Sequence, residues 1–326
     1  MRYFILSLFT VATYFLGASP TPQKVSNFKD LALPEISLEA IAQKDHSWTA
    51  TLSAQKTFTL LATGDVLLAR TINSRNVARK DFIFPFIPTK NLLSSADTTY
   101  INLETPLLPN CPTSASGTVF CGDPQNVAGL LFAGVDVASI ANNHSYDFLE
   151  QGFASTQKIL ESNNIGAVSP DHAFKATTKG SRISYHAFND IWSRSKEFSK
   201  VDSDQMATEI KKARETSNLV IVMFHWGNEY TEKISERQKY LAHLAIDSGA
   251  DLIIGNHPHW IQSSEIYQGK LISYSLGNFI FDQYWSKKTM EGQVAKYIFY
   301  ENRLIDAEYI PVTQTTNGQT IKKVIQ

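Results

Sequence analysis

Short apolar runs alternate with longer amphipathic segments along most of the chain. Runs of β-branched and other apolar residues occur at 57–62, 99–102, 137–141, 219–224, 252–254 and 271–275. Because polar residues hardly interrupt them, these runs are typical of strands that are covered on both faces. Helical patterns lie between them, so the order of elements predicts an α/β fold.

Signals at the ends of the helical patterns place three of the helices. Asp147 is a candidate N-cap for a helix over 148–162. Ser235 and Gln238 form a capping-box pattern at the start of a second helix. A weaker apolar stripe predicts a third helix over about 204–215.

The first 56 residues do not follow this alternation. Arg2 precedes an apolar run over 3–17, and small residues and Pro20 come next. This arrangement is typical of a secretory signal peptide over 1–19, with an uncleaved membrane anchor as the alternative. Residues 20–56 carry little periodicity, which indicates a linker.

Charge and cysteine content narrow the class of protein. The 326 residues carry 30 basic and 31 acidic side chains, for a formal net charge of −1, and no basic block occurs. A nucleic-acid partner is therefore not expected. Cys111 and Cys121 lie in one turn-rich loop. In an oxidising compartment we expect them to form a disulfide, with two free thiols as the alternative.

Polar side chains that can bind a metal follow five of the predicted strands. In chain order they are Asp65, Glu104, Asn143 with His144, His225, and His257 with His259. Because the ligand crevice of an open α/β sheet lies beyond the carboxyl ends of its strands, we expect these side chains to converge. Each one alone has an ordinary explanation as a turn, a cap or a buried histidine. Together, carboxylate, amide and imidazole groups without thiolates favour a site for Mn, Zn, Fe or Mg.

Six blocks of sequence carry a more specific signal. They are ATGDVLLAR (62–70), INLETPL (101–107), ANNHSYD (141–147), FHWGNEY (224–230), GADLIIGNHPHWIQ (249–262) and YSLGNFIFD (274–282). In this order they resemble the bacterial CapA-type family of capsule and poly-γ-glutamate biosynthesis, over about residues 57–312, which leaves 313–326 as a C-terminal tail. That family is similar to the calcineurin-like metallophosphoesterases. The resemblance implies a four-layer αββα sandwich with a two-metal cleft at the strand ends.

The resemblance also implies two metal sites that share one carboxylate. The ligands would be Asp65, Glu104 and His259 for the first site, and Glu104, Asn143, His225 and His257 for the second. The phosphoesterases have a histidine where this chain has Leu67. The first site therefore lacks an imidazole, and we expect one or two divalent ions, with the first ion held more weakly.

The function that the resemblance implies is a part in the synthesis of capsule, poly-γ-glutamate or another envelope polymer outside the cytoplasm. The full row of ligands favours a metal-dependent hydrolase or transferase, in which His144 would be the general acid. The alternative is a non-catalytic subunit that holds an anionic polymer during export, and Leu67 favours it. The expected partners are an anionic polymer and a membrane-bound synthesis or export complex.

We expect fractionation of the native host cells to place this protein outside the cytoplasm. The reason is the charged start and the apolar run over 3–17, which direct a chain to the export machinery. The protein should be processed near residues 18–21 or remain attached to the membrane. Full-length soluble protein in the cytoplasm would contradict this prediction.

Overall fold

The computed structural model describes residues 33–196 and 198–323, which form two β-sheets with helices packed against them. The signal peptide or anchor expected over 1–19 lies outside the described residues, as does the start of the expected linker. Within the described part of the chain, no helix has both the length and the apolar character needed to cross a membrane.

The first sheet has the strand order β14-β13-β12-β1-β2-β3-β4, and β11 also pairs with β1. Its strands are β1 (Thr57–Val66), β2 (Thr98–Leu103), β3 (Val137–Ser139), β4 (Gly166–Val168), β11 (Asn278–Ile280), β12 (Glu291–Tyr300), β13 (Arg303–Gln314) and β14 (Thr320–Lys322). Strands β1 to β4 are parallel. Strand β12 is antiparallel to β1, β13 to β12, and β14 to β13. The carboxyl ends of β1, β2 and β3 therefore meet at one edge.

The second sheet has the strand order β5-β6-β7-β8-β10-β9. Its strands are β5 (Phe174–Thr178), β6 (Ser181–Asn189), β7 (Leu219–His225), β8 (Leu252–Asn256), β9 (Ile261–Tyr267) and β10 (Lys270–Leu276). The four central strands are parallel, and the two edge strands are antiparallel to their neighbours. In this register His225 lies beside Asn189 on one side and Asn256 on the other.

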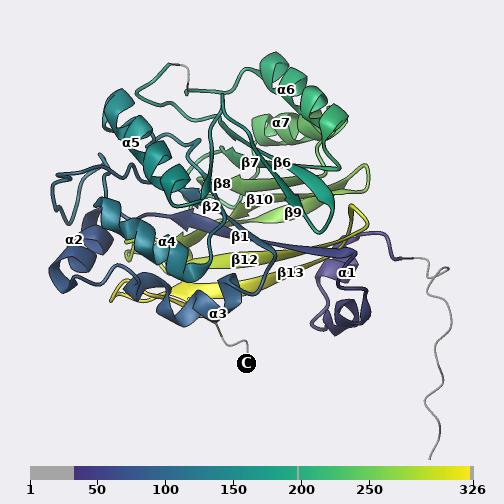
Figure 1. The fold of residues 1–326 in the computed structure, drawn as a ribbon, viewed down its shortest axis with the longest axis horizontal. Coiled ribbons are helices and arrows are strands. Elements are labelled where there is room, and N and C mark those ends of the chain that lie inside the picture. The colour runs from purple at the N-terminus through teal and green to yellow at the C-terminus, as the bar shows by residue number, and fades with distance from the viewer. Residues whose placement is uncertain (1–32, 197, 324–326) are drawn as a thin grey trace, which may run out of the picture. The chain divides into compact units, whose positions relative to one another are not determined.

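Helices flank both sheets (Figure 1). They are α1 (Leu38–Ile41), α2 (Arg70–Arg79), α3 (Lys90–Leu93), α4 (Val127–Ala133), α5 (Leu149–Ser162), α6 (Ser203–Thr216) and α7 (Glu236–Asp247). Short 3₁₀ turns occur at Ser47–Thr51, Phe84–Thr89, Pro124–Asn126 and Lys288–Met290. Helices α2 to α5 gather along the first sheet, and α6 and α7 pack against the second.

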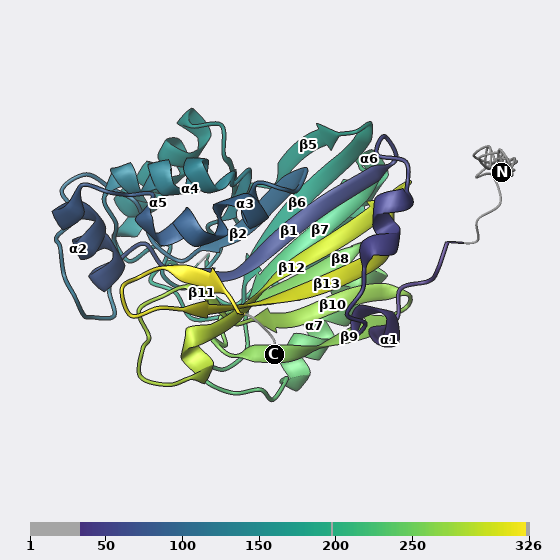
Figure 2. The same cartoon turned by 90° about the horizontal axis from the view of Figure 1, so that it is seen from below.

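Three apolar clusters separate the layers. The first joins the first sheet to α2–α5, the second fills the space between the sheets, and the third joins the second sheet to α6 and α7. Leu60 and Leu61 on β1 enter the second and first clusters, because successive side chains of a strand point to opposite faces. Ile221 and Val222 on β7 divide in the same way. The predicted four-layer αββα sandwich is confirmed, with α6 and α7, the second sheet, the first sheet, and α3 and α4 stacked from top to bottom in Figure 1. Figure 2 views the same body from below, where the strands of the two sheets overlap.

The helices and strands lie close to where the sequence pattern places them. Each of the six apolar runs forms a strand, and α7 begins at the capping box formed by Ser235 and Gln238. The N-cap expected at Asp147 is wrong: the cap residue of α5 is Phe148, and it makes no side-chain capping bond. The Asp147 carboxylate instead accepts hydrogen bonds from the backbone N–H of Phe120 and from the ring of His144.

The outer boundaries of the folded body also differ from the expected ones. Residues 35–56 were expected in a linker, but Ile36 and Ile41 are buried in the cluster between the sheets and α1 packs against β13. The expected tail beyond residue 312 contains the end of β13 and all of β14, which pairs with it. Both segments are too short to show a periodic pattern, and it is their packing on β13 that orders them.

His186 on β6 is a buried histidine of the second sheet. Its Nε2 lies 2.9 Å from the hydroxyl oxygen of Ser184, and its side chain is almost fully enclosed. Burial, with a smaller contribution from Lys175, lowers the pKa of His186 from 6.5 to about 4. The unfolded chain therefore takes up a proton at this position at a higher pH than the folded protein does.

We expect this difference to destabilise the protein as the pH falls from 6.5 toward 4. The loss attributable to His186 should reach about 3 kcal/mol of unfolding free energy below pH 4. His186→Gln keeps a partner for Ser184 but does not titrate, so its stability should fall less over this range. Denaturant unfolding of both proteins at neutral pH and near pH 4.5 tests this, and parallel losses would contradict it.

Candidate functional site

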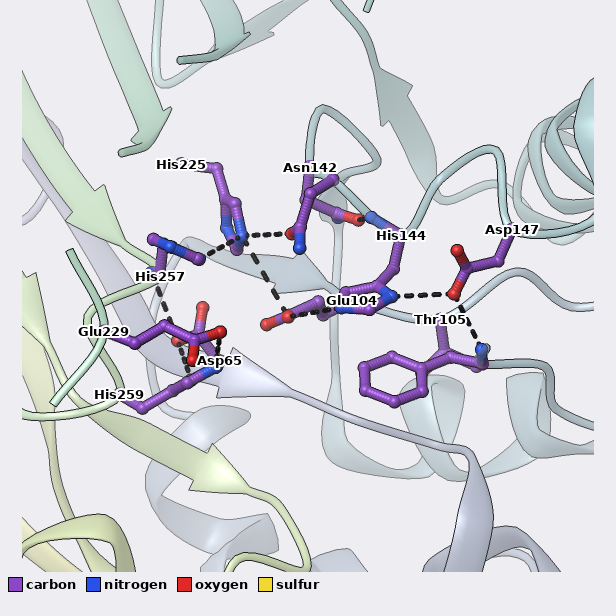
Figure 3. Close-up of polar contacts among 12 residues, drawn as sticks. Asp65, Glu104, Thr105, Asn142, His144, Asp147, His225, Glu229, His257 and His259 are labelled. Atoms are coloured by element: carbon purple, nitrogen blue, oxygen red, sulfur yellow. Dashed lines mark hydrogen bonds and ion pairs between the residues drawn. The ribbon is translucent and has the colours of Figure 1, made fainter. Parts of the chain in front are cut away.

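The metal-ligating side chains predicted from the sequence converge where the carboxyl ends of strands from the two sheets meet (Figure 3). Asn102 near the end of β2 joins the two sheets directly. Its Nδ2 donates a hydrogen bond of 2.8 Å to Asp65 Oδ1 and lies 3.2 Å from His225 Nδ1. The side chains of Asp65, Asn102 and His225 are all buried. One amide thus fixes a carboxylate of the first sheet relative to an imidazole of the second.

Gly64 allows β1 to deliver Asp65 to this place. A Cβ atom at Gly64 would lie 2.1 Å from the carbonyl oxygen of Gly277, which is closer than any side chain tolerates. The same carbonyl accepts a hydrogen bond of 2.9 Å from the backbone N–H of Asp65. In the Gly-Asp pair of the sequence motif, Gly64 therefore allows the close backbone contact, and Asp65 is the candidate ligand that follows it.

His259 is oriented by two oxygen atoms. Its Nδ1 lies 3.1 Å from Asp65 Oδ2 and 2.9 Å from Asn278 Oδ1, so Nδ1 acts as a donor and Nε2 is the nitrogen left to bind a metal ion. Asp65 Oδ2 also accepts a hydrogen bond from the backbone N–H of His257. These bonds hold the loop after β8 against β1.

The loop after β8 adopts an unusual backbone to place both of its imidazoles. His257 has a φ of 96° and His259 a φ of 58°, in the left-handed region that side chains other than glycine rarely occupy. Such conformations cost about 1–3 kcal/mol each and concentrate at functional sites. The strain turns both rings toward the strand ends, where Asp65 and His225 lie.

The second group of candidate ligands surrounds His225 Nε2. This atom lies 2.8 Å from Asn143 Oδ1, 3.1 Å from His257 Nδ1 and 4.0 Å from Glu104 Oε1. Burial lowers the pKa of His225 and of His257 well below the usual value, and neighbouring histidines lower it further. Both rings are therefore neutral, which is the form that binds a metal ion.

Glu104 lies between the two groups and has both carboxylate oxygens buried without a hydrogen-bond partner. Burial raises its pKa well above the usual range, and the charges of Asp65 and Glu229 raise it further. A buried carboxylate without a partner is costly in free energy. A divalent cation beside Glu104 would supply the missing partner, so the residues present fit such an ion.

His144 stands beside the cluster and is held by Asp147. Its Nδ1 lies 2.7 Å from Asp147 Oδ2, and its Nε2 lies 3.7 Å from Glu104 Oε1. The ring of Phe120 stacks on the imidazole at a centroid distance of 3.7 Å. Because the backbone N–H of Phe120 also donates to Asp147 Oδ2, the carboxylate and the aromatic ring fix one orientation of His144.

Phe120 is carried by the loop that contains both cysteines. The structure joins Cys111 and Cys121 in a disulfide with Cα atoms 5.9 Å apart. The guanidinium group of Arg70 lies 4.8 Å from the centre of the Phe120 ring and forms an ion pair with Asp282. The disulfide and the contact with Arg70 therefore both hold the loop that carries Phe120, the ring that contacts His144.

A comparison of the sequence with protein families bears on the nature of this cluster. Residues 59–283 match the model of the family described as bacterial capsule synthesis protein PGA_cap. The chain belongs to this family. The resemblance noted from the six sequence blocks is therefore confirmed.

Individual relatives agree with this assignment. The chain is 28% identical over 320 residues to the capsule biosynthesis protein CapA of Bacillus anthracis, with 90% of this chain and 77% of the relative covered. It is 27% identical over 269 residues to the PGA biosynthesis protein CapA of Bacillus subtilis, with coverages of 76% and 70%. A solved structure described as a novel phosphatase from Mycoplasma pneumoniae superposes with a TM-score of 0.52 and 15% identity, over 79% of this chain and 94% of that one. The last similarity shows the metallophosphoesterase-like fold.

In this PGA_cap member, several side chains at the cluster were not predicted as part of it from the sequence. Among them are Asn102, Asp147, Glu229 and Asn278. Asn102 stands two positions before Glu104 in a strand motif, so its side chain shares a face with that ligand. Glu229 lies in the same sequence block as His225, and this closeness in sequence was the available signal that Glu229 belongs to the site. The role of Asp147 carries no such signal, because its spacing from His144 equally fits a helix cap.

We expect removal of the disulfide by Cys111→Ser with Cys121→Ser to lower the free energy of unfolding. A closed loop of this length stabilises a folded chain by about 2–3 kcal/mol. Denaturant unfolding of the variant and of the oxidised wild type measures the difference. Wild type unfolded in a reducing buffer is the control and should match the variant. A variant as stable as the oxidised wild type would show that the disulfide contributes nothing.

Proposed function

We propose that this chain is an exported, metal-dependent hydrolase or transferase that acts on a polymer of the cell envelope. Membership of the PGA_cap family supports the link to capsule or poly-γ-glutamate synthesis. The names of the relatives, which are capsule and PGA biosynthesis proteins, support the same class of polymer. The partners that follow from this are an anionic polymer and its membrane-bound synthesis or export complex.

The observation that carries the metal-dependent part is the buried, unpartnered carboxylate of Glu104 among neutral imidazoles. The residues that would hold one or two divalent ions are Asp65, Glu104, Asn143, His225, His257 and His259. A divalent ion in such a site makes bound water a nucleophile at neutral pH and stabilises negative charge on the attacked group. Oxygen and nitrogen ligands without thiolates suit Mn²⁺, Zn²⁺, Fe²⁺ or Mg²⁺.

His144 is the residue placed to move a proton. Asp147 holds the proton of His144 on Nδ1, and the ring directs Nε2 toward the ligand cluster. When Nε2 is also protonated, it can give that proton to a departing oxygen or nitrogen atom of the substrate. The Asp147 carboxylate stabilises the charged imidazolium before this transfer and orients the ring throughout.

A second function, a non-catalytic subunit that holds an anionic polymer during export, is favoured by one observation. Leu67 is fully buried in an apolar cluster with Ala69, Phe120 and Phe281, so this position contributes no ligand. In that case the metal would serve only as an anchor for carboxylate or phosphate groups. The two functions differ in whether His144 is needed once metal and fold are intact.

We expect His144→Ala to keep the fold and the bound metal but to lower turnover by about 10²–10⁴-fold, as loss of a general acid does. Turnover is measured on the substrate found in a screen of phosphoesters and γ-glutamyl amides, and polymer production is measured by complementation. His172→Ala is the matched control, because His172 is exposed and pairs only loosely with Glu161, at 3.8 Å.

The same preparations give the outcome that separates the two functions. Melting temperature and metal content show whether each variant is folded and loaded. A folded, metal-loaded His144→Ala protein that fully restores polymer production would exclude the catalytic role and leave the subunit function. A loss of activity that only follows a loss of stability would show that His144 acts through the fold.

A further inference from the structure

The first metal site, as the sequence defines it, has only three ligands. Asp65, Glu104 and His259 bring one ligand atom each to within 4.8 Å of one another, and all three side chains are buried. Leu67 cannot add a fourth, because its side chain packs against Phe281 in an apolar cluster. A fourth protein ligand for this site would have to come from another part of the fold.

Glu229 lies in the loop between β7 and α7. Backbone hydrogen bonds on both sides of Glu229 join this loop to the end of β8 and the loop that follows it. The backbone N–H of Trp226 donates to the carbonyl of Asn256, and that of Tyr230 donates to the carbonyl of Pro258, at 3.1 and 2.8 Å. The hydroxyl of Tyr230 also accepts a hydrogen bond from the side chain of Gln283. Glu229 is therefore held next to the histidines that follow β8.

The position of the Glu229 carboxylate fits a ligand of the first metal. Its Oε1 lies 3.9 Å from His259 Nε2, the ring nitrogen that is not bonded to Asp65 or Asn278. Glu229, His257 and His259 also bring ligand atoms to within 4.8 Å of one another, so His259 belongs to both groups (Figure 3). Two ligands of one tetrahedral metal, each about 2.0–2.2 Å from it, lie about 3.3–3.6 Å apart, which is slightly less than the separation seen here.

The charges around Glu104 also favour a cation at this place. Glu104 has no hydrogen-bond partner for either carboxylate oxygen, and Asp65 and Glu229 add negative charge beside it. Like charges that are brought together in a buried place destabilise each other unless one of them takes up a proton or a cation lies between them. Glu229 itself is 42% exposed at its side chain, so it approaches the buried ligands from the solvent side.

We propose that Glu229 is the fourth ligand of the first metal and replaces the imidazole that Leu67 does not supply. This inference rests on the metal centre of the proposed function. The site then has three carboxylates and one imidazole, an oxygen-rich set that suits Mn²⁺, whereas the second site has two imidazoles. Both sites are four-coordinate by protein, so the weak binding expected for the first ion from the sequence does not follow. As the exposed ligand, Glu229 is the one that an oxygen atom of the substrate can displace.

The test is the number of Mn²⁺ ions that the metal-stripped protein binds. Equilibrium dialysis followed by elemental analysis should give two ions per chain for the wild type. Glu229→Gln keeps the size of the side chain but loses its charge. It should lower the affinity for one ion by at least about tenfold while the other ion stays bound. Glu232→Gln is the matched control: Glu232 lies in the same loop and pairs with Lys288 at an exposed position, so both ions should remain.

The outcomes separate this inference from the proposed function. Glu229→Gln protein that binds the same number of Mn²⁺ ions with wild-type affinity would overturn the role of Glu229. A wild type that binds no Mn²⁺, Zn²⁺ or Mg²⁺ would overturn both the inference and the metal centre. A third outcome is that the wild type binds two ions, the Glu229→Gln protein binds one, and the wild type turns over no polymer or phosphoester. This would overturn the proposed hydrolase activity and leave Glu229 as a ligand. Melting temperatures of the metal-free proteins show that the variants are folded.

Discussion

The face-to-face packing of the two sheets is the contact on which the rest of the structure depends. Leu60 and Tyr100 of the first sheet and Tyr185 and Ile221 of the second belong to one buried apolar cluster. Full burial of a large apolar side chain contributes about 1.5–3 kcal/mol, so this layer dominates the favourable free energy of folding at the centre of the molecule. It also fixes the two sheets relative to each other, and this brings their strand ends together.

The strand ends carry a cluster whose own contribution to stability is unfavourable. Glu104 is buried without hydrogen bonds, and His257 and His259 have left-handed backbones. A fold retains such features where surrounding packing over-determines them and where they serve a function. Here the strands deliver the candidate ligands from positions that apolar neighbours hold in place, so the rigidity of the sandwich is what preorganises the candidate metal site.

The two sides of the site are built in different ways. The ligands come from strand ends and from the loop after β8, whereas His144 is held by a loop that a disulfide closes. Phe120 and Asp147 connect this loop to the imidazole without contacting the ligand nitrogens of His225 or His259. The imidazole of His144 is therefore positioned independently of the candidate metal ligands, which allows the two proposed roles to be separated by mutation.

The sequence by itself determined the four-layer sandwich and most of the candidate metal ligands at its strand ends. Strands such as β1 and β7 are buried on both faces, so they are largely apolar, and a charged or imidazole side chain at the end of such a strand stands out from the run before it. Strands such as β5 and β9 are half exposed and mixed in composition, and they were not predicted. The family blocks added the roles of the strand-end residues, because five of the six contain a candidate ligand at or just after the end of a strand.

Only the tertiary structure decided which residues complete the site. The Asp147 carboxylate bonds to His144 and to the backbone N–H of Phe120 instead of capping α5. Glu229 faces His259 because the loops after β7 and β8 are bonded together. Asn102 joins Asp65 to His225 only because the sheets pack face to face. A strand-end ligand is defined by its own segment, whereas these partners depend on distances between segments far apart in the chain, and packing alone sets those distances.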